Sequence, residues 1–138
     1  MNNEEIFNVL FKSAEATKVV AHAKLASILI YKRSVVSFGF NQMKTHPLQF
    51  KFGKNKKSVF LHSEIDCIKN AIRYIDPEDF NKSSLYTLRI KRSGRGGDLI
   101  TGMSLPCEGC MKAILSFGIK NVYYTEENSR TFTCLENW

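Results

Sequence analysis

Hydrophobic residues recur along this chain with two periods, and each period predicts a different kind of element. From residue 4 to about residue 18 the apolar positions lie three and four residues apart, as on one face of an amphipathic helix. Residues 24–31 and 34–40 are rich in aliphatic and aromatic side chains and are joined by two polar residues, which predicts an antiparallel hairpin. Residues 41–59 form a predicted polar loop, and a loop of this length is typical of functional segments.

The second half of the chain alternates helices with strands. An apolar stripe predicts a helix over residues 64–75, and Pro77 cannot continue it. A second helix is predicted after Pro106 and ends at Gly118. The predicted strands of this half are 85–91, 98–103 and 119–125. Strands that alternate with helices predict an α/β protein with a layered sheet, and the length predicts one domain over residues 1–138.

Two segments of this half are less regular. Residues 94–97 are glycine-rich and predict a flexible turn between two strands. The tail, residues 126–138, matches neither period, although Phe132 and Trp138 are expected to pack against the body of the protein. Cys67, at the edge of an apolar stripe, is expected to be a small buried thiol.

The composition is that of a folded globular protein. Of 138 residues, 43% are hydrophobic and 24% are charged. Disordered segments have a much lower content of hydrophobic residues, so the composition excludes this class. The start is acidic rather than basic, and the longest apolar stretch, near residues 25–31, is far shorter than the ~20 residues of a membrane span. We therefore expect a soluble, cytoplasmic protein with no membrane partner. Four cysteines in that reducing compartment are more typical of metal ligands or buried thiols than of disulfides.

The net charge is +7, which is typical of proteins with an anionic partner, either a polyanion or a small phosphorylated molecule, and also of proteins in which the charge serves only solubility. The positive charge is concentrated in two basic clusters. The first consists of Lys51, Lys54, Lys56 and Lys57, and the second of Lys91, Arg92 and Arg95.

Two short motifs stand at the starts of the two helices after the hairpin. They are His62-Ser63-Glu64 and Pro106-Cys107-Glu108-Gly109-Cys110. His62 and the two cysteines are zinc ligands by type, and cysteines three residues apart share one face of a helix, so both can reach one ion. Three protein ligands leave the fourth tetrahedral position for water, as in catalytic zinc sites. Glu64 is placed to exchange a proton with that water.

The pair His-x-Glu and Pro-Cys-x-x-Cys resembles the signature of the zinc-dependent cytidine and deoxycytidylate deaminase superfamily. The resemblance extends from about residue 35 to residue 125, and the segments 39–41, 44–47 and 118–124 are similar to small phage- and virus-encoded dCMP-type deaminases. It implies a three-layer α/β/α sandwich with a mixed sheet of about five strands, one catalytic Zn²⁺ in each subunit, and a homo-oligomer. For a phage or viral protein, the implied compartment is the host cytoplasm.

The activity that the resemblance implies is hydrolytic deamination of cytosine to uracil in a free nucleotide, first dCMP, then CMP or the nucleosides. In this reaction zinc hydroxide attacks C4 while Glu64 carries the protons. The resemblance also implies that Asn41 binds the substrate sugar or base and that the backbone amide of Ser63 meets the pyrimidine 2-carbonyl. Ser63 stands where the family has alanine, and a backbone contact tolerates that change.

Further substrate contacts are expected from the loop after the hairpin and from the segment before the second motif. Lys44 and His46 lie in that loop and are candidates for binding a substrate phosphate, as are Lys54 and the turn at 92–95. The predicted substrate-binding residues are Asn41, Ser63, Lys44, His46 and Ser104.

Other interpretations of the same residues stay open. A Cys-x-x-Cys pair also occurs in redox proteins and in closed structural zinc sites, for which Cys134 would be the fourth ligand. The basic clusters, with Phe50 and Phe52 among the lysines, favour as an alternative the deamination of cytosine or adenine in single-stranded DNA or RNA. An inactive deaminase fold that serves as a binding module is a third interpretation, which the intact Glu64 disfavours.

Overall fold

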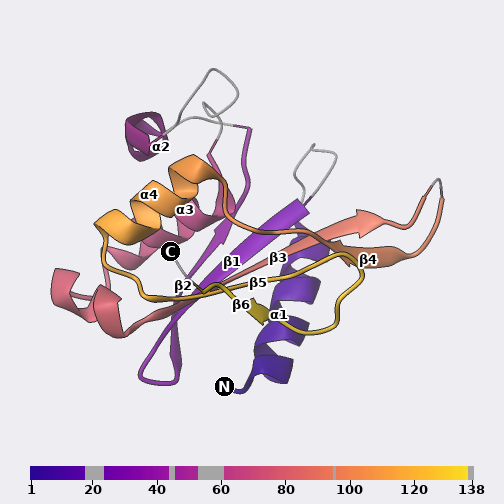
Figure 1. Cartoon of the computed structure of the whole chain (residues 1–138), viewed down its shortest axis with the longest axis horizontal. Helices are drawn as coiled ribbons and strands as arrows, with labels where there is room; N and C mark the ends of the chain where they lie inside the picture. The colour runs from indigo at the N-terminus through magenta and orange to yellow at the C-terminus, as the bar shows by residue number, and fades with distance from the viewer. Residues whose placement is uncertain (18–23, 44–45, 53–60, 95, 137–138) are drawn as a thin grey trace.

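The computed structural model describes residues 1–17, 24–43, 46–52, 61–94 and 96–136, and it contains one mixed β-sheet with helices on both faces (Figure 1). Five of its six strands follow the order β2 (Ser34–Phe40), β1 (Lys24–Tyr31), β3 (Ser84–Arg92), β5 (Asn121–Tyr124) and β6 (Thr133–Cys134). The sixth, β4 (Leu99–Gly102), pairs with the end of β3 that extends past β5. The predicted α/β/α sandwich is confirmed. Its sheet has six strands rather than about five because the unassigned tail contributes β6 (Thr133–Cys134).

The first three elements follow the predicted helix and hairpin closely. They are α1 (Asn3–Ala16), β1 (Lys24–Tyr31) and β2 (Ser34–Phe40). Asn2 caps α1, since its side-chain oxygen accepts a hydrogen bond from the N–H of Glu5 at 2.8 Å. Lys32 and Arg33, which link the strands, have φ values of 52° and 65°, the left-handed conformation that a tight hairpin turn requires.

A short helix, α2 (Pro47–Phe52), lies within the predicted loop 41–59, so the loop prediction is wrong at these residues. Pro47 occupies the first helical position, where a proline loses no hydrogen bond. The Nδ1 atom of His46 accepts the N–H of Leu48 at 3.0 Å. The three lysines of the first basic cluster that follow α2 lie outside the described residues.

The next helix, α3 (Ser63–Ala71), ends at Ala71 rather than at the predicted residue 75. Beyond it the N–H groups of Tyr74 and Ile75 both bond to the carbonyl of Ala71, which closes a turn. Pro77 then starts the 3-10 helix η2 (Pro77–Lys82), which the pattern did not predict. A proline disfavours the helical conformation of the residue before it, and Asp76 is extended, with ψ of 156°.

The remaining elements agree with the prediction. They are β3 (Ser84–Arg92), β4 (Leu99–Gly102), α4 (Glu108–Ser116) and β5 (Asn121–Tyr124). β3 pairs antiparallel with β1 and β4 and parallel with β5, so it lies at the centre of the sheet. After α4, Gly118 adopts a φ of 82°, a left-handed conformation that ends a helix at little cost for glycine.

Each face of the sheet carries a hydrophobic core. On one face α1 buries Ile6, Leu10 and Ala14. On the other face α3 and α4 pack over the sheet, and Cys67 is fully buried among them, as predicted. Phe132 is 9% exposed and packs edge-on against Tyr86, which confirms the prediction for this residue of the tail, whereas Trp138 lies outside the described residues.

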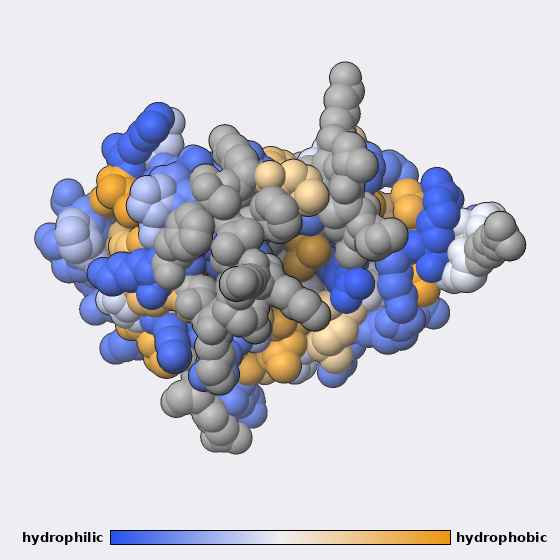
Figure 2. Space-filling view, turned by 90° about the horizontal axis from the view of Figure 1, so that it is seen from above, coloured by the Kyte–Doolittle hydropathy of each residue, from blue (hydrophilic) through white to orange (hydrophobic). Residues whose placement is uncertain are grey.

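The helices α3 and α4 lie side by side on one face, with α1 on the other (Figure 1). The view from above shows mainly hydrophilic side chains, with smaller and separate apolar patches between them (Figure 2). Within the described part of the chain, no helix has the length and apolar character needed to cross a membrane.

Candidate metal centre and active site

The residues predicted as metal ligands lie at the starts of α3 and α4. His62 and Cys107 are the N-cap residues, and Cys110 lies in the first turn of α4. The Cys107 sulfur accepts the N–H of Cys110 at 3.5 Å, and this bond caps α4. His62 Nδ1 lies 3.2 Å from Cys110 Sγ and 3.5 Å from Cys107 Sγ. The structure therefore brings the three together, with donor atoms that all lie within 4.8 Å of one another.

This arrangement fits zinc. With Zn–S bonds of about 2.3 Å and Zn–N bonds of about 2.0 Å, the edges of a tetrahedron around the ion measure about 3.5 to 3.8 Å. The two N···S distances of 3.2 and 3.5 Å are close to these edges. Among the described residues the group contains no fourth ligand, and Cys134, the candidate for a closed site, lies apart from it in β6. Three ligands leave one position for water.

The two thiols of the site titrate very differently because they share a hydrogen bond. The hydrogen bond from the side chain of Cys110 lowers the pKa of the Cys107 thiol to about 4, and His62 lowers it further. The same bond, together with burial, raises the pKa of Cys110 well above its usual value. The pKa of His62 is raised, chiefly by its hydrogen bond to Cys107. Cys107 is therefore a thiolate at neutral pH, and its charge attracts a metal cation.

Glu64 lies in the first turn of α3 and is only 4% exposed. Burial raises the pKa of its carboxyl, and a hydrogen bond donated by Ser63 Oγ at 2.8 Å opposes that rise. Ser63 accepts a hydrogen bond from Ser27 at 2.9 Å, and Ser27 lies 2.7 Å from the hydroxyl of Thr87. Because each hydroxyl has one proton, the donors run from Thr87 through Ser27 and Ser63 to Glu64. A carboxyl with a raised pKa is suited to exchange protons near neutral pH.

A cavity of about 380 Å³ opens beside these groups. Small-molecule sites measure about 300 to 1,000 Å³, so the cavity has room for one small substrate. Its described lining residues are Leu25, Asn41, Gln42, Met43, Leu61, His62, Ser63, Glu64, Arg89, Met103, Ser104, Leu105 and Cys107. Apolar walls with a few polar groups suit a flat heterocyclic ring.

Three of the predicted substrate-binding residues line this cavity, namely Asn41, Ser63 and Ser104. The side-chain oxygen of Asn41 is held by the N–H of Leu25 at 2.9 Å, at the end of β2. The hydroxyl of Ser104 is engaged with the sheet: it donates to the carbonyl of Thr87 at 2.7 Å and accepts the N–H of Thr125 at 2.7 Å. In the structure that hydroxyl joins β3 to the end of β5.

The other predicted phosphate contacts are not at the cavity or lie outside the described residues. His46 is not among the lining residues, and its ring bonds to the backbone of α2. Lys44, Lys54 and Arg95 fall in the segments that are not described. In the second basic cluster, Lys91 pairs with Glu127, and Arg92 donates to the carbonyl of Gly97 at 3.0 Å. The described members of both clusters therefore lie away from the cavity lining.

Arg89 of β3 lines the cavity instead, and the sequence analysis missed it. Its Nε atom is buried and, in the described part of the chain, has no hydrogen-bond partner. Side chains alternate along a strand, and Leu88 and Ile90 on either side belong to the core under α1, so Arg89 points to the opposite face. A charged residue between two aliphatic residues, Leu88 and Ile90, was the signal that could have identified it.

Comparison with known proteins identifies the family. Residues 1–126 match the family described as the cytidine and deoxycytidylate deaminase zinc-binding region. The dCMP deaminase of cyanophage S-TIM5 in complex with dCMP and dUMP has a similar structure, with a TM-score of 0.56 and 19% identity over 88% of this chain and 78% of that chain. The apo form of that enzyme gives a TM-score of 0.51 and 22% identity over 94% of this chain and 89% of that chain. No curated protein matches the chain.

The structural similarity, at these identities, shows a shared fold. The family match goes further, because it spans the hairpin, both helix starts and the strands between them. The residues at those helix starts have the donor types and the spacing that zinc requires. The chain therefore belongs to the cytidine and deoxycytidylate deaminase family and is a zinc-dependent deaminase.

Proposed function

We propose that the protein deaminates cytosine to uracil in a free nucleotide, with dCMP as the preferred substrate and CMP or the nucleosides after it. The observation that carries the proposal is that a buried Glu64, a metal ligand and the cation Arg89 line one cavity. A cytosine nucleotide combines a flat ring with an anionic phosphate, and the cavity offers apolar walls and a guanidinium. The fold neighbour that holds dCMP and dUMP supports the same class of substrate.

The chemistry divides between the metal and Glu64. Zinc held by His62, Cys107 and Cys110 supplies a water of lowered pKa. Glu64 accepts a proton from the water side of the cavity and delivers it to N3 of the base, then passes a second proton to the amino group. The C4–N bond breaks, a C4–O bond replaces it, and ammonia leaves, so cytosine and water give uracil and ammonia. The raised pKa of Glu64 helps it to give back each proton that it takes up.

Two further groups orient the substrate. The backbone N–H of Ser63 belongs to the first turn of α3, where N–H groups have no partner within the helix and are available to a carbonyl of the base. Asn41 lies at the end of β2, and its side chain is fixed by Leu25. We assign the first group to the pyrimidine 2-carbonyl and the second to the sugar or base.

Arg89 is the group that we assign to the phosphate. Within the described residues it forms no ion pair, and its buried Nε has no partner, so an anionic ligand would satisfy it. Gly102 of β4 lies opposite Arg89 in the sheet. A methyl group on Gly102 would lie 3.2 Å from Cδ of Arg89, so the missing side chain leaves room for the stem of the arginine.

Mass spectrometry of the reaction products tests the proposal. The zinc-loaded protein is incubated with dCMP, CMP, deoxycytidine, cytidine and a single-stranded oligonucleotide, with Glu64→Gln as the inactive control. We expect uracil products from the free substrates, dCMP first, and none from the control. Product from the oligonucleotide alone would overturn the proposal in favour of a polynucleotide deaminase, and equal turnover by Glu64→Gln would refute the role of Glu64.

The phosphate assignment is tested by the ratio of kcat/KM for dCMP to that for deoxycytidine. Loss of a charge-assisted contact in Arg89→Met should lower this ratio about 10- to 100-fold. Arg89→Lys keeps the charge but lacks the planar set of guanidinium N–H donors, so it should restore part of the ratio. Arg92→Met removes the same charge from the last residue of β3 and should change the ratio less than about twofold. Equal loss in the two methionine variants would show that Arg89 does not read the phosphate.

The proposal includes two properties of the whole protein. Free nucleotides and reduced thiols coexist in the cytoplasm, so we place the protein there, in the host if a phage or virus encodes it. We also propose that it works as a homo-oligomer, which light scattering at assay concentration tests, and a monomer there would contradict this.

A further inference from the structure

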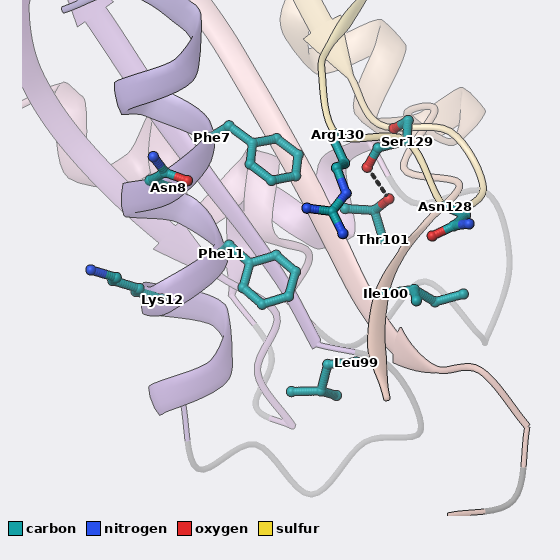
Figure 3. A pocket seen from close by; sticks show the side chains of 10 residues that line it. All are labelled: Phe7, Asn8, Phe11, Lys12, Leu99, Ile100, Thr101, Asn128, Ser129 and Arg130. Atoms are coloured by element: carbon teal, nitrogen blue, oxygen red, sulfur yellow. Dashed lines mark hydrogen bonds between the residues drawn. The ribbon is translucent and has the colours of Figure 1, made fainter. Parts of the chain in front are cut away.

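A second cavity, of about 260 Å³, lies on the α1 side of the molecule, between α1, β4 and the segment that carries Arg130 (Figure 3). Among the described residues, it shares no lining residue with the cavity beside Glu64. The deaminase chemistry uses nothing in this part of the fold, so the features of this second cavity need a separate explanation.

One wall of the second cavity is aromatic. α1 turns Ile6, Leu10 and Ala14 into the core, and this leaves Phe7 and Phe11 as a second stripe on its flank, one turn apart. Their ring centroids lie 6.1 Å apart with 27° between the planes, and both side chains point into the cavity (Figure 3). Phe7 also packs edge-on against Phe132, with centroids 5.8 Å apart. The wall is therefore held in place by the core and is only partly covered.

The opposite wall supplies a cation. The side chain of Arg130 points toward α1 and lines the same cavity as Phe7 and Phe11 (Figure 3). The described lining residues of the cavity include no carboxylate, and none of the described carboxylates forms an ion pair with Arg130. A guanidinium in this position offers its planar set of N–H donors to a ligand, and carboxylates and phosphates match that set.

The segment that presents Arg130 is tied to the sheet. Thr101 of β4 donates its hydroxyl to the carbonyls of Ser129 and Glu126. In return the N–H of Asn128, which has a left-handed φ of 55°, donates to the carbonyl of Thr101 at 2.8 Å. These bonds fix the backbone before the arginine, so less conformational entropy is lost when an anion binds there.

We propose that this cavity binds a small anion with a flat apolar ring, an aryl phosphate or aryl carboxylate, whose ring packs on Phe7 and Phe11 and whose anionic group pairs with Arg130. Its volume is near the lower end of ligand sites, about 300 Å³, which matches one ring with one anionic group. The ring and the charge act together, so neither inorganic phosphate nor a neutral aromatic molecule satisfies both walls.

Calorimetric titration of the zinc-loaded, full-length protein tests the proposal with four probes. Phenyl phosphate and benzoate carry both features, inorganic phosphate lacks the ring, and phenol lacks the charge. We expect one of the first two to bind with a Kd of about 1 mM or tighter and the other two to bind at least about tenfold more weakly. The stronger of the first two identifies the anionic group.

Two variants decide where the probe binds. Arg130 is exposed, so Arg130→Gln should fold normally, as an unchanged Tm would verify, and should weaken binding about tenfold or more. Arg89→Met, which alters only the cavity beside Glu64, should leave the Kd as it is. The proposal is overturned by binding that survives Arg130→Gln, by binding that is lost in Arg89→Met, by phenol binding as tightly as the anions, or by no binding tighter than about 1 mM.

Discussion

At the scale of single residues, a chain of hydroxyl groups links the sheet to Glu64, the proposed proton-transfer group. Thr87 and Ser27 come from the two central strands, and Ser63 from α3, and all three are buried. A hydrogen bond donated to a carboxylate contributes about 1.5 to 3 kcal/mol, more than a bond between neutral groups. Ser63 therefore fixes one oxygen of Glu64.

Ser63→Ala should lower kcat for dCMP about tenfold, with a smaller change in KM, because the variant loses that bond but keeps the backbone N–H. The bond from Ser63 lowers the pKa of Glu64, so its loss raises that pKa further. As the pH is lowered, the carboxylate of the variant is then protonated at a higher pH than in the wild type. The acid limb of the kcat/KM profile should therefore shift to higher pH. Ser37→Ala is the matched control, since Ser37 is also buried but bonds to the carbonyl of Cys67. If both variants have the same pH profile, Ser63 has only a structural role.

The residues of the metal centre could be predicted because their signal is local. His62, Cys107 and Cys110 are soft or borderline ligands at helix starts, and two of them stand one turn apart. Arg89 could not be recognised in the same way, because its position depends on the pairing of β3 with Gly102 of β4. The hydroxyl of Ser104, close in sequence to the cysteines, is engaged with Thr87 and Thr125, a contact that only the folded sheet creates.

At the scale of elements, the close packing of α3 on β2 sets the position of the metal centre. The hydrogen bonds that join them include Ser37 Oγ to the carbonyl of Cys67 at 2.9 Å, the side chain of Asn70 to the carbonyl of Phe38 at 2.8 Å, and the N–H of Phe40 to Asp66 at 3.0 Å. Gly39 lies between these contacts. A Cβ there would overlap the carbonyl oxygen of Ser63 and the nitrogen of Cys67.

Gly39→Ala should therefore push the start of α3 away from the sheet. We expect it to lower the free energy of unfolding by about 1 to 3 kcal/mol, the usual cost of overpacking, and to reduce both zinc content and activity. Gly94→Ala is the control, because a Cβ at Gly94 meets nothing within 4 Å and its φ of 89° adds only backbone strain, worth about 1 kcal/mol. Denaturant unfolding with zinc analysis separates the two, and normal zinc content in Gly39→Ala would contradict the argument.

Elements with a clear period were predicted, whereas those that depend on proline were not. The hairpin strands match the prediction because two-residue links and apolar runs leave few alternatives. Pro47 and Pro77 each start a short helix, and in a sequence a proline that starts a helix looks like one that ends the preceding element. The strand β6 has two residues, too few to show any alternation.

At the scale of the whole molecule, the net charge of +7 does not by itself identify the substrate. In the described part of the second basic cluster, Lys91 pairs with Glu127, and Arg92 donates to the carbonyl of Gly97 in the turn that follows β3. Arg89, by contrast, is partly buried and lines the cavity itself. The binding of a substrate through a few contacts near the base and the binding of a strand through many phosphate contacts depend on salt very differently.

This difference distinguishes a nucleotide enzyme from a polynucleotide enzyme. For single strands the logarithm of affinity falls with the logarithm of salt concentration by about 0.7 for each phosphate contact. Between about 50 and 200 mM salt, six contacts along a strand reduce kcat/KM about 300-fold, whereas a free nucleotide has no condensed counterions to release, so a single contact at Arg89 depends far less on salt. We expect the shallow dependence, with dCMP as substrate, and little turnover of an oligonucleotide at either concentration. A steep loss on an oligonucleotide that is turned over well at low salt would mean that the basic loops bind a strand and that the cavity takes its base from it.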